Sequence, residues 1–270
     1  MTDRDREFSP TPYAEVYHLL QVFLAEVRAV LGEQFIGLYL YGSLASGDFV
    51  PARSDIDFLV VTAGELPAGV ISALGNLHAR LWATGAKWAL KLEGSYITQA
   101  ALRRYNPEDG PFPCVNEGKF YLARHESDWV LQRHILRESG VAVAGPDIGP
   151  LIDPVSPADI RAAVRGYLRE WWQPMLRNPE RLQSREYQAY ATLSMCRAFY
   201  TLQHGRVASK TDSARWAQRT FGERWTALID RALAWPEGEQ ADEITETLGF
   251  MQFCITEYMA ILDRSDGEAT

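Results

Sequence analysis

Helical and extended hydrophobic patterns alternate along the first hundred residues. The predicted helices cover residues 13–31 and 67–84, and the predicted strands cover residues 35–41, 57–62 and 88–98. Gly32 provides the stop after the first helix. The strand at 57–62 is apolar on both faces, as a central strand is. Because a helix lies between strands, the pattern predicts an α/β unit.

The character of the chain changes after about residue 105. Residues 106–116 contain three prolines and a glycine, which predicts a loop. Beyond this loop the predicted helices cover residues 128–138, 156–172, 184–204, 211–221, 223–235 and 241–262, with a frayed end at residues 265–270. We therefore predict an α+β protein with its domain boundary at residue 150. Residues 1–150 would form a mixed sheet with flanking helices, and residues 151–270 an all-α bundle.

Composition narrows the classes of partner. The formal net charge of −8 and the lack of a dense Lys/Arg cluster argue against a nucleic-acid partner and suit a cationic small molecule. The cysteines, Cys114, Cys196 and Cys254, are widely spaced, which predicts buried thiols in a reducing compartment and no zinc site. Residues 1–10 are polar, and no apolar run is long enough to cross a bilayer. We expect a monomeric, soluble protein of the cytoplasm that does not bind membranes.

Two short motifs lie between and at the ends of the first two predicted strands. Gly42 and Ser43 end the first strand, where backbone amides and the Ser43 hydroxyl could meet a phosphate chain. Asp55 and Asp57 open the second strand, and their spacing predicts side chains on one face, about 7 Å apart. Such a pair suits a divalent metal. Each motif alone also fits an ordinary turn or a solvated loop end.

Glu93 is a third candidate carboxylate, on the predicted polar face of the strand at 88–98 beside Lys91 and Ser95. If this strand neighbours the strand that carries Asp57, Glu93 can ligate a metal or accept a proton from an attacking hydroxyl. The alternative is an exposed strand residue that pairs with Lys91.

Together these motifs resemble the nucleotidyltransferase superfamily of the polymerase-beta type, whose signature is Gly-Ser, a spacer, Asp-x-Asp and a later carboxylate. The later chain resembles bacterial aminoglycoside 3''/9-adenylyltransferases. That resemblance rests on residues 128–131, 145–146, 151–155, 192–200, 205–210 and 216–217.

The resemblance implies transfer of AMP from Mg-ATP to a hydroxyl of spectinomycin or streptomycin. It implies Asp55 and Asp57 as Mg²⁺ ligands, Glu93 as base and metal ligand, and Lys210 as a phosphate contact from the helical domain. Lys210 also fits a solvated first-turn lysine. Two other classes stay open: transfer to another small molecule or a protein side chain, as in antitoxin-type enzymes, and a nucleotide-binding regulatory module.

Some segments depart from the family. Residues 116–126 lack the tryptophan of streptomycin-modifying relatives, and Glu186 stands near the position of an expected aspartate. Trp171 and Trp172 fit a bundle core and its rim, and they could also line a different acceptor pocket. His125 and His134 fit surface or hydrogen-bonded positions.

Overall fold

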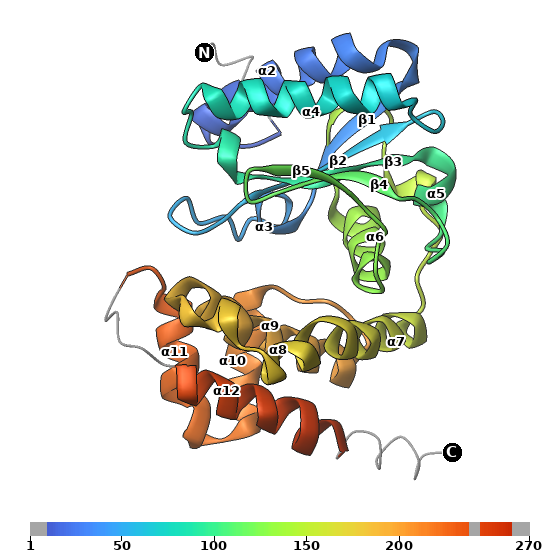
Figure 1. The fold of residues 1–270 in the computed structure, drawn as a ribbon. Coiled ribbons are helices and arrows are strands. Elements are labelled where there is room, and N and C mark those ends of the chain that lie inside the picture. The colour runs from blue at the N-terminus through green and yellow to red at the C-terminus, as the bar shows by residue number, and fades with distance from the viewer. Residues whose placement is uncertain (1–9, 238–243, 261–270) are drawn as a thin grey trace. The chain divides into compact units, whose positions relative to one another are not determined.

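The computed structural model describes residues 10–237 and 244–260, and the chain divides into two compact units between Val155 and Ser156. Figure 1 shows the first unit as a sheet with helices on both faces and the second as helices throughout the described residues. The predicted fold class is confirmed: a mixed sheet with flanking helices is followed by a helical domain.

The sheet of the first unit has six strands in the order β5-β4-β3-β2-β1-β6. They are β1 (Phe35–Leu40), β2 (Ile56–Thr62), β3 (Leu92–Thr98), β4 (Phe112–Asn116), β5 (Lys119–Ala123) and β6 (Val141–Ala144). Strands β2 and β3 are parallel and are joined through helix α4 (Ala68–Ala83), whereas the other neighbours are antiparallel. The predicted α/β unit is therefore present at the centre of the sheet.

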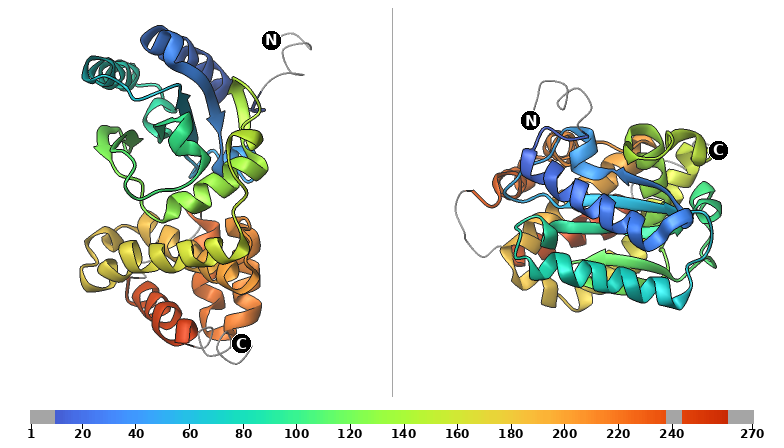
Figure 2. Two further views of the ribbon diagram at one scale, coloured as in Figure 1. Left: turned by 90° about the vertical axis from the view of Figure 1, so that its right-hand side faces the viewer. Right: turned by 90° about the horizontal axis from the view of Figure 1, so that it is seen from above.

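Alternation along the central strands divides the core into two layers. One layer, which includes Phe58 and Val60, packs against α2 (Ala14–Leu31) and α4. The other, which includes Leu59 and Val61, packs against α5 (Gln99–Arg103) and α6 (Asp128–Ser139). Figure 2 shows α2 and α4 side by side over the sheet. Asp57 belongs to the α6 side, because it is two residues before Leu59.

The sheet corrects two predictions. The strand at 88–98 begins only at Leu92, because Ala89–Lys91 forms a 3-10 turn that leaves Leu90 54% exposed. The loop at 106–116 ends before β4, which pairs with the unpredicted β5 through a hairpin turn. Positive φ angles at Glu117 and Gly118 suit such a two-residue turn. The short, half-exposed β5 and β6 carry little alternation to detect.

The helical unit matches the predicted series closely. Its helices are α7 (Pro157–Tyr167), α8 (Gln173–Arg177), α9 (Arg185–His204), α10 (Lys210–Phe221), α11 (Thr226–Ala234) and α12 (Ile244–Gln252). α9 is the central helix, because α7, α10, α11 and α12 all pack on it. Residues 241–243 and 261–262 of the last predicted helix, and the end at 265–270, lie outside the described residues. All three cysteines are buried thiols, as predicted.

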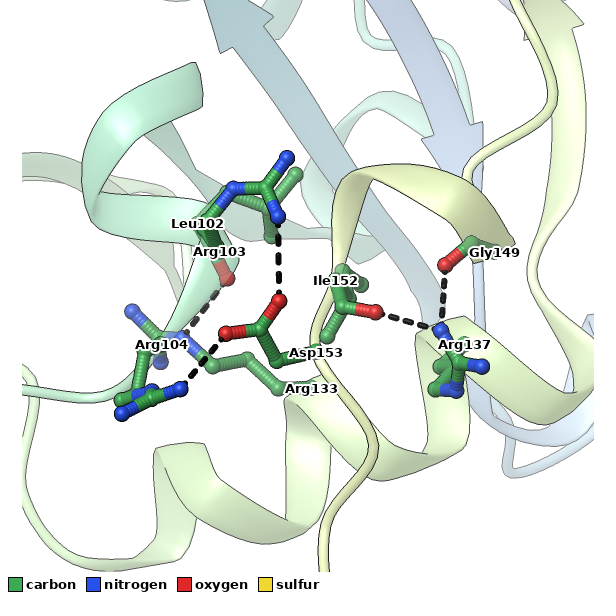
Figure 3. Close-up of polar contacts among 8 residues, drawn as sticks. All are labelled: Leu102, Arg103, Arg104, Arg133, Arg137, Gly149, Ile152 and Asp153. Atoms are coloured by element: carbon green, nitrogen blue, oxygen red, sulfur yellow. Dashed lines mark hydrogen bonds and ion pairs between the residues drawn. The ribbon is translucent and has the colours of Figure 1, made fainter.

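The last segment of the first unit is fastened to α5 and α6 by arginines (Figure 3). Arg103 and Arg104 both donate to the Asp153 carboxylate, at 3.0 and 2.9 Å. Arg137 donates to the carbonyl oxygens of Gly149 and Ile152. These contacts fix the backbone immediately before the division between the units.

Candidate active site

The turn after β1 lies directly against the Asp57 carboxylate. Gly42 has φ +62°, and a Cβ atom at this position would lie 2.0 Å from Oδ2 of Asp57. The Tyr41 amide also donates to the Asp57 carbonyl oxygen, at 3.1 Å. Gly42 and Ser43 begin a one-turn helix, α3 (Gly42–Ser46), where the sequence predicted a simple turn. Only glycine combines this backbone angle with so close an approach.

Asp57 and Glu93 are direct partners across the parallel strands β2 and β3. Residues paired in this register point to the same face of the sheet, so the two carboxylates lie side by side. The condition under which Glu93 was expected to approach Asp57, that their strands are neighbours, is met.

Asp55 does not share a strand with Asp57, because β2 begins at Ile56. Its carboxylate instead forms an ion pair with the Nζ atom of Lys91, at 3.0 Å. Lys91 was considered as a partner of Glu93, and the structure pairs it with Asp55. The Lys91 ammonium therefore offsets the negative charge of Asp55.

The negative charge of this site affects the pKa of the buried Tyr41 hydroxyl. Burial, and then the negative charges of Asp57, Glu93 and Asp128, raise the pKa of Tyr41 well above its ordinary value. The phenol therefore stays protonated. Asp128, the first residue of α6, was not identified as a site residue from the sequence.

Beneath the carboxylates lies a layer of buried polar contacts. Ser95, two residues after Glu93, has its Oγ 3.1 Å from the Pro113 carbonyl oxygen and 3.0 Å from Nε2 of His125. The His125 ring stacks on Trp129 with centroids 3.4 Å apart. Burial, and then the charge of Arg133, lower the pKa of His125 to about 2. His125 is therefore a neutral interior residue. The sequence predicted a surface or hydrogen-bonded helix residue, and the hydrogen bond is present, although His125 precedes α6 and is buried.

The carboxylate oxygens of Asp57 and Glu93 are the type of ligand that a hard divalent cation binds. Asp57 and Glu93 offer carboxylate oxygens at adjacent positions, the ligand type that Mg²⁺ prefers. Within the described residues, no three His, Cys, Asp or Glu side chains are already grouped as a metal centre. The third candidate carboxylate, Asp55, is paired with Lys91.

Lys210 lies in the second unit, at the first position of α10. Its Nζ atom is 5.0 Å from the centre of the Tyr190 ring on α9. The neighbouring aromatic residues divide as expected for a core and its rim, since Trp172 is fully buried and Trp171 partly exposed. The guanidinium carbon of Arg181 lies over the Trp171 ring, 5.3 Å from the ring centre.

Comparison with known proteins assigns both units. Residues 24–133 match the family model of the nucleotidyltransferase domain, and residues 150–259 match that of the aminoglycoside adenylyltransferase C-terminal domain. Both units therefore match domains found in aminoglycoside adenylyltransferase-like nucleotidyltransferases. The chain is accordingly an enzyme of the nucleotidyltransferase class.

The relatives are distant but extend over most of the chain. A spectinomycin 9-adenylyltransferase of Staphylococcus aureus is 23% identical over 230 residues, covering 80% of this chain and 84% of the relative. An aminoglycoside (3'') (9) adenylyltransferase of Escherichia coli is 26% identical over 241 residues, covering 86% and 89%.

A solved structure shares the fold. The crystal structure of the spectinomycin adenyltransferase AAD(9) from Enterococcus faecialis, with ATP and spectinomycin, matches with a TM-score of 0.69 at 17% identity, covering 88% of this chain and 98% of that one. Among the helices that the structure describes, none has the length and apolar character needed to cross a membrane.

Proposed function

We propose that this protein transfers AMP from Mg-ATP to a hydroxyl group of an aminocyclitol or aminoglycoside antibiotic of the spectinomycin or streptomycin class, releasing pyrophosphate. The observation that carries the proposal is the pairing of Asp57 with Glu93 beside the Gly42 turn. The matches of both units to the two family models support it, and so do the activities for which the relatives are named.

The site residues divide between the two halves of the reaction. The amides and hydroxyl of Gly42 and Ser43 would hold the phosphates, with Lys210 contributing from the helical unit. Asp55, Asp57 and Glu93 would hold Mg²⁺, which when bound neutralises triphosphate charge. Asp55 would contribute Oδ2, because its Oδ1 is paired with the Nζ atom of Lys91.

Glu93 is the proposed general base. The acceptor oxygen attacks the α-phosphorus, its bond to phosphorus forms as the bond to the pyrophosphate oxygen breaks, and the hydroxyl proton passes to the Glu93 carboxylate. A carboxylate on a rigid central strand suits this role, because its position is fixed before the substrate arrives.

Spectinomycin is the preferred acceptor within this proposal. Residues 116–126 lack the tryptophan that streptomycin-modifying relatives carry, and Phe120 of this segment is packed against the α4 side of the core. We further propose a nucleotidyltransferase domain at residues 1–150 and a helical domain at residues 151–270, acting as a monomer in the cytoplasm, without nucleic-acid or membrane partners.

The test is pyrophosphate release with Mg-ATP and each antibiotic, in the wild type and in Glu93→Gln. We expect E93Q to lose about 10²–10⁴-fold in kcat, the usual contribution of a general base, while Mg-ATP still binds. Glu65→Gln is the matched control, since this exposed carboxylate lies beyond the other end of β2 and should leave turnover unchanged. Full activity in E93Q would exclude Glu93 as the base, and no antibiotic-dependent release in the wild type would refute the proposed function.

A further inference from the structure

Gly94 occupies a point of unusually close approach between the two central strands. It follows Glu93 in β3, and its register partner in β2 is Phe58, which follows Asp57. A Cβ atom at Gly94 would lie 2.0 Å from the Phe58 carbonyl oxygen and 2.8 Å from the Cγ and Cδ1 atoms of the Phe58 ring. The strands therefore approach each other here more closely than a residue with a Cβ atom allows.

Phe58 is held in place and cannot yield easily to such a Cβ atom. Its side chain is fully buried, and its ring packs against the rings of Phe23 and Tyr96, with centroids 4.9 and 6.0 Å away. The nearest atom is a backbone oxygen within β2, which cannot turn aside as the end of a side chain can. Since real Cβ contacts essentially never fall below 3.0 Å, the strands would have to shift by about 1 Å, the difference between 3.0 and 2.0 Å.

Such a shift acts on the neighbouring pair of carboxylates. Asp57 and Glu93 each precede one of the two clashing residues by a single position, so the gap between them depends on how closely β2 and β3 approach at Gly94. Mg²⁺ demands near-ideal octahedral geometry with oxygen ligands at about 2.0–2.1 Å, whereas Ca²⁺ accepts flexible geometry at about 2.3–2.6 Å. A gap that the backbone fixes can therefore distinguish between the two ions.

We propose that Gly94 is a positioning residue that fixes the gap between Asp57 and Glu93 and thereby favours Mg²⁺ over larger divalent cations. The proposal rests on the proposed function, in which these two carboxylates hold Mg²⁺. The competing explanation is that Gly94 only allows β2 and β3 to pack. Loss of packing alone would weaken the binding of every ligand and would not depend on the size of the ion.

The experiment compares Gly94→Ala with Gly37→Ala in the full-length protein. Gly37 lies in β1, where a Cβ atom would first meet the Tyr39 side chain, so this control overpacks the same sheet without parting β2 from β3. Calorimetry measures the Kd of a non-hydrolysable ATP analogue without metal, with Mg²⁺ and with Ca²⁺. Pyrophosphate release with Mg-ATP and spectinomycin is followed in parallel, and circular dichroism verifies folding.

We expect G94A to bind the metal-free analogue as the wild type does, because that complex does not depend on the gap between the carboxylates. The affinity of G94A for the Mg²⁺ complex should fall by about 10–100-fold, the usual effect of disturbing the support of metal ligands, and its affinity for the Ca²⁺ complex should fall less. G37A should match the wild type in all three titrations. Equal losses with and without metal in folded G94A, or no loss with Mg²⁺, would overturn the proposal.

Glu93→Asp supplies a second test that leaves the strand pairing intact. It widens the gap by one methylene group, so it should also weaken the Mg²⁺ complex more than the Ca²⁺ complex. Unchanged Mg²⁺ dependence in E93D would overturn the proposal even if G94A does not fold. If the wild type releases pyrophosphate with spectinomycin and G94A keeps its Mg²⁺ affinity, only this inference fails, whereas no release by the wild type refutes the proposed function as well.

Discussion

Gly42→Ala offers a direct test of how closely the turn after β1 must approach the Asp57 carboxylate. The added Cβ atom would lie 2.0 Å from Oδ2 of Asp57, whereas real Cβ contacts essentially never fall below 3.0 Å, so Asp57 must retreat by roughly the difference. A misplacement of about 1 Å at a reacting centre can cost about 10²-fold in rate. We therefore expect kcat/KM to fall by about two orders of magnitude.

The substitution also has a backbone cost that must be separated from the contact. Gly42 has φ +62°, and a left-handed angle costs a residue with a Cβ atom about 1–2 kcal/mol. Gly47→Ala is a matched control, because Gly47 ends the same short helix with φ +83° and an added Cβ would meet nothing within 4 Å. Both variants share this backbone cost, G42A adds the displacement of Asp57, and only G42A should lose most of its activity.

The assay combines thermal unfolding, followed by circular dichroism, with pyrophosphate release at saturating Mg-ATP and varied spectinomycin. A loss of activity in G42A that exceeds the loss in G47A by tenfold or more supports the contact with Asp57. Equal kcat/KM values in the two folded variants would refute the reasoning, because the clash would then have no effect on the reacting groups.

Two further predictions concern the buried His78 and the contact between Tyr190 and Lys210. Burial lowers the pKa of His78 to about 4, and its Nε2 atom lies 2.8 Å from the Tyr96 hydroxyl. Because the unfolded histidine takes up a proton below its ordinary pKa near 6.5, acid favours unfolding, and the free energy of unfolding should fall by about 2 kcal/mol from pH 7 to pH 5 through this group. Urea titrations of the wild type and His78→Gln should show a smaller fall in the variant, and an equal fall in both would contradict the assignment. If Lys210 contacts the nucleotide phosphates as proposed, Tyr190→Leu should raise the KM for ATP by about two- to fivefold, because a cation–π contact of about 0.5–1 kcal/mol positions the Lys210 ammonium. If Tyr190→Leu weakens ATP binding equally in protein that already carries Lys210→Ala, Tyr190 does not act through Lys210.

Strong periodicity explains which elements could be predicted from the sequence. α2, α4 and α9 have a buried stripe or a fully buried body, and Gly32 and Gly205 end their helices with positive φ angles. The sheet was less predictable at its edges. β5 exposes much of both faces, so its sequence carries no period-two alternation. The residues before Leu92 do alternate, but they form a turn, and there the alternation was misleading.

The candidate site also contains residues that the sequence predicted and residues that it did not. Residue type and spacing predicted Asp55, Asp57 and Glu93 as site residues, because two carboxylates at the start of a buried strand repel each other unless a cation or solvent screens them. His125 and Asp128 carry no such signal, since a single histidine and a helix-opening aspartate are common in many settings.

By itself, the sequence determined the kinds of secondary structure, the division into a mixed-sheet half and a helical half, and the chemical groups offered to a ligand. Only the tertiary structure decided which groups meet. The parallel register sets Glu93 opposite Asp57, an ion pair joins Asp55 to Lys91, and the charge of Asp128 acts on the same buried Tyr41 hydroxyl as the charges of Asp57 and Glu93. The physical reason is that periodicity encodes which side of an element is buried, whereas strand order, register and charge pairing arise from packing between residues far apart in the chain.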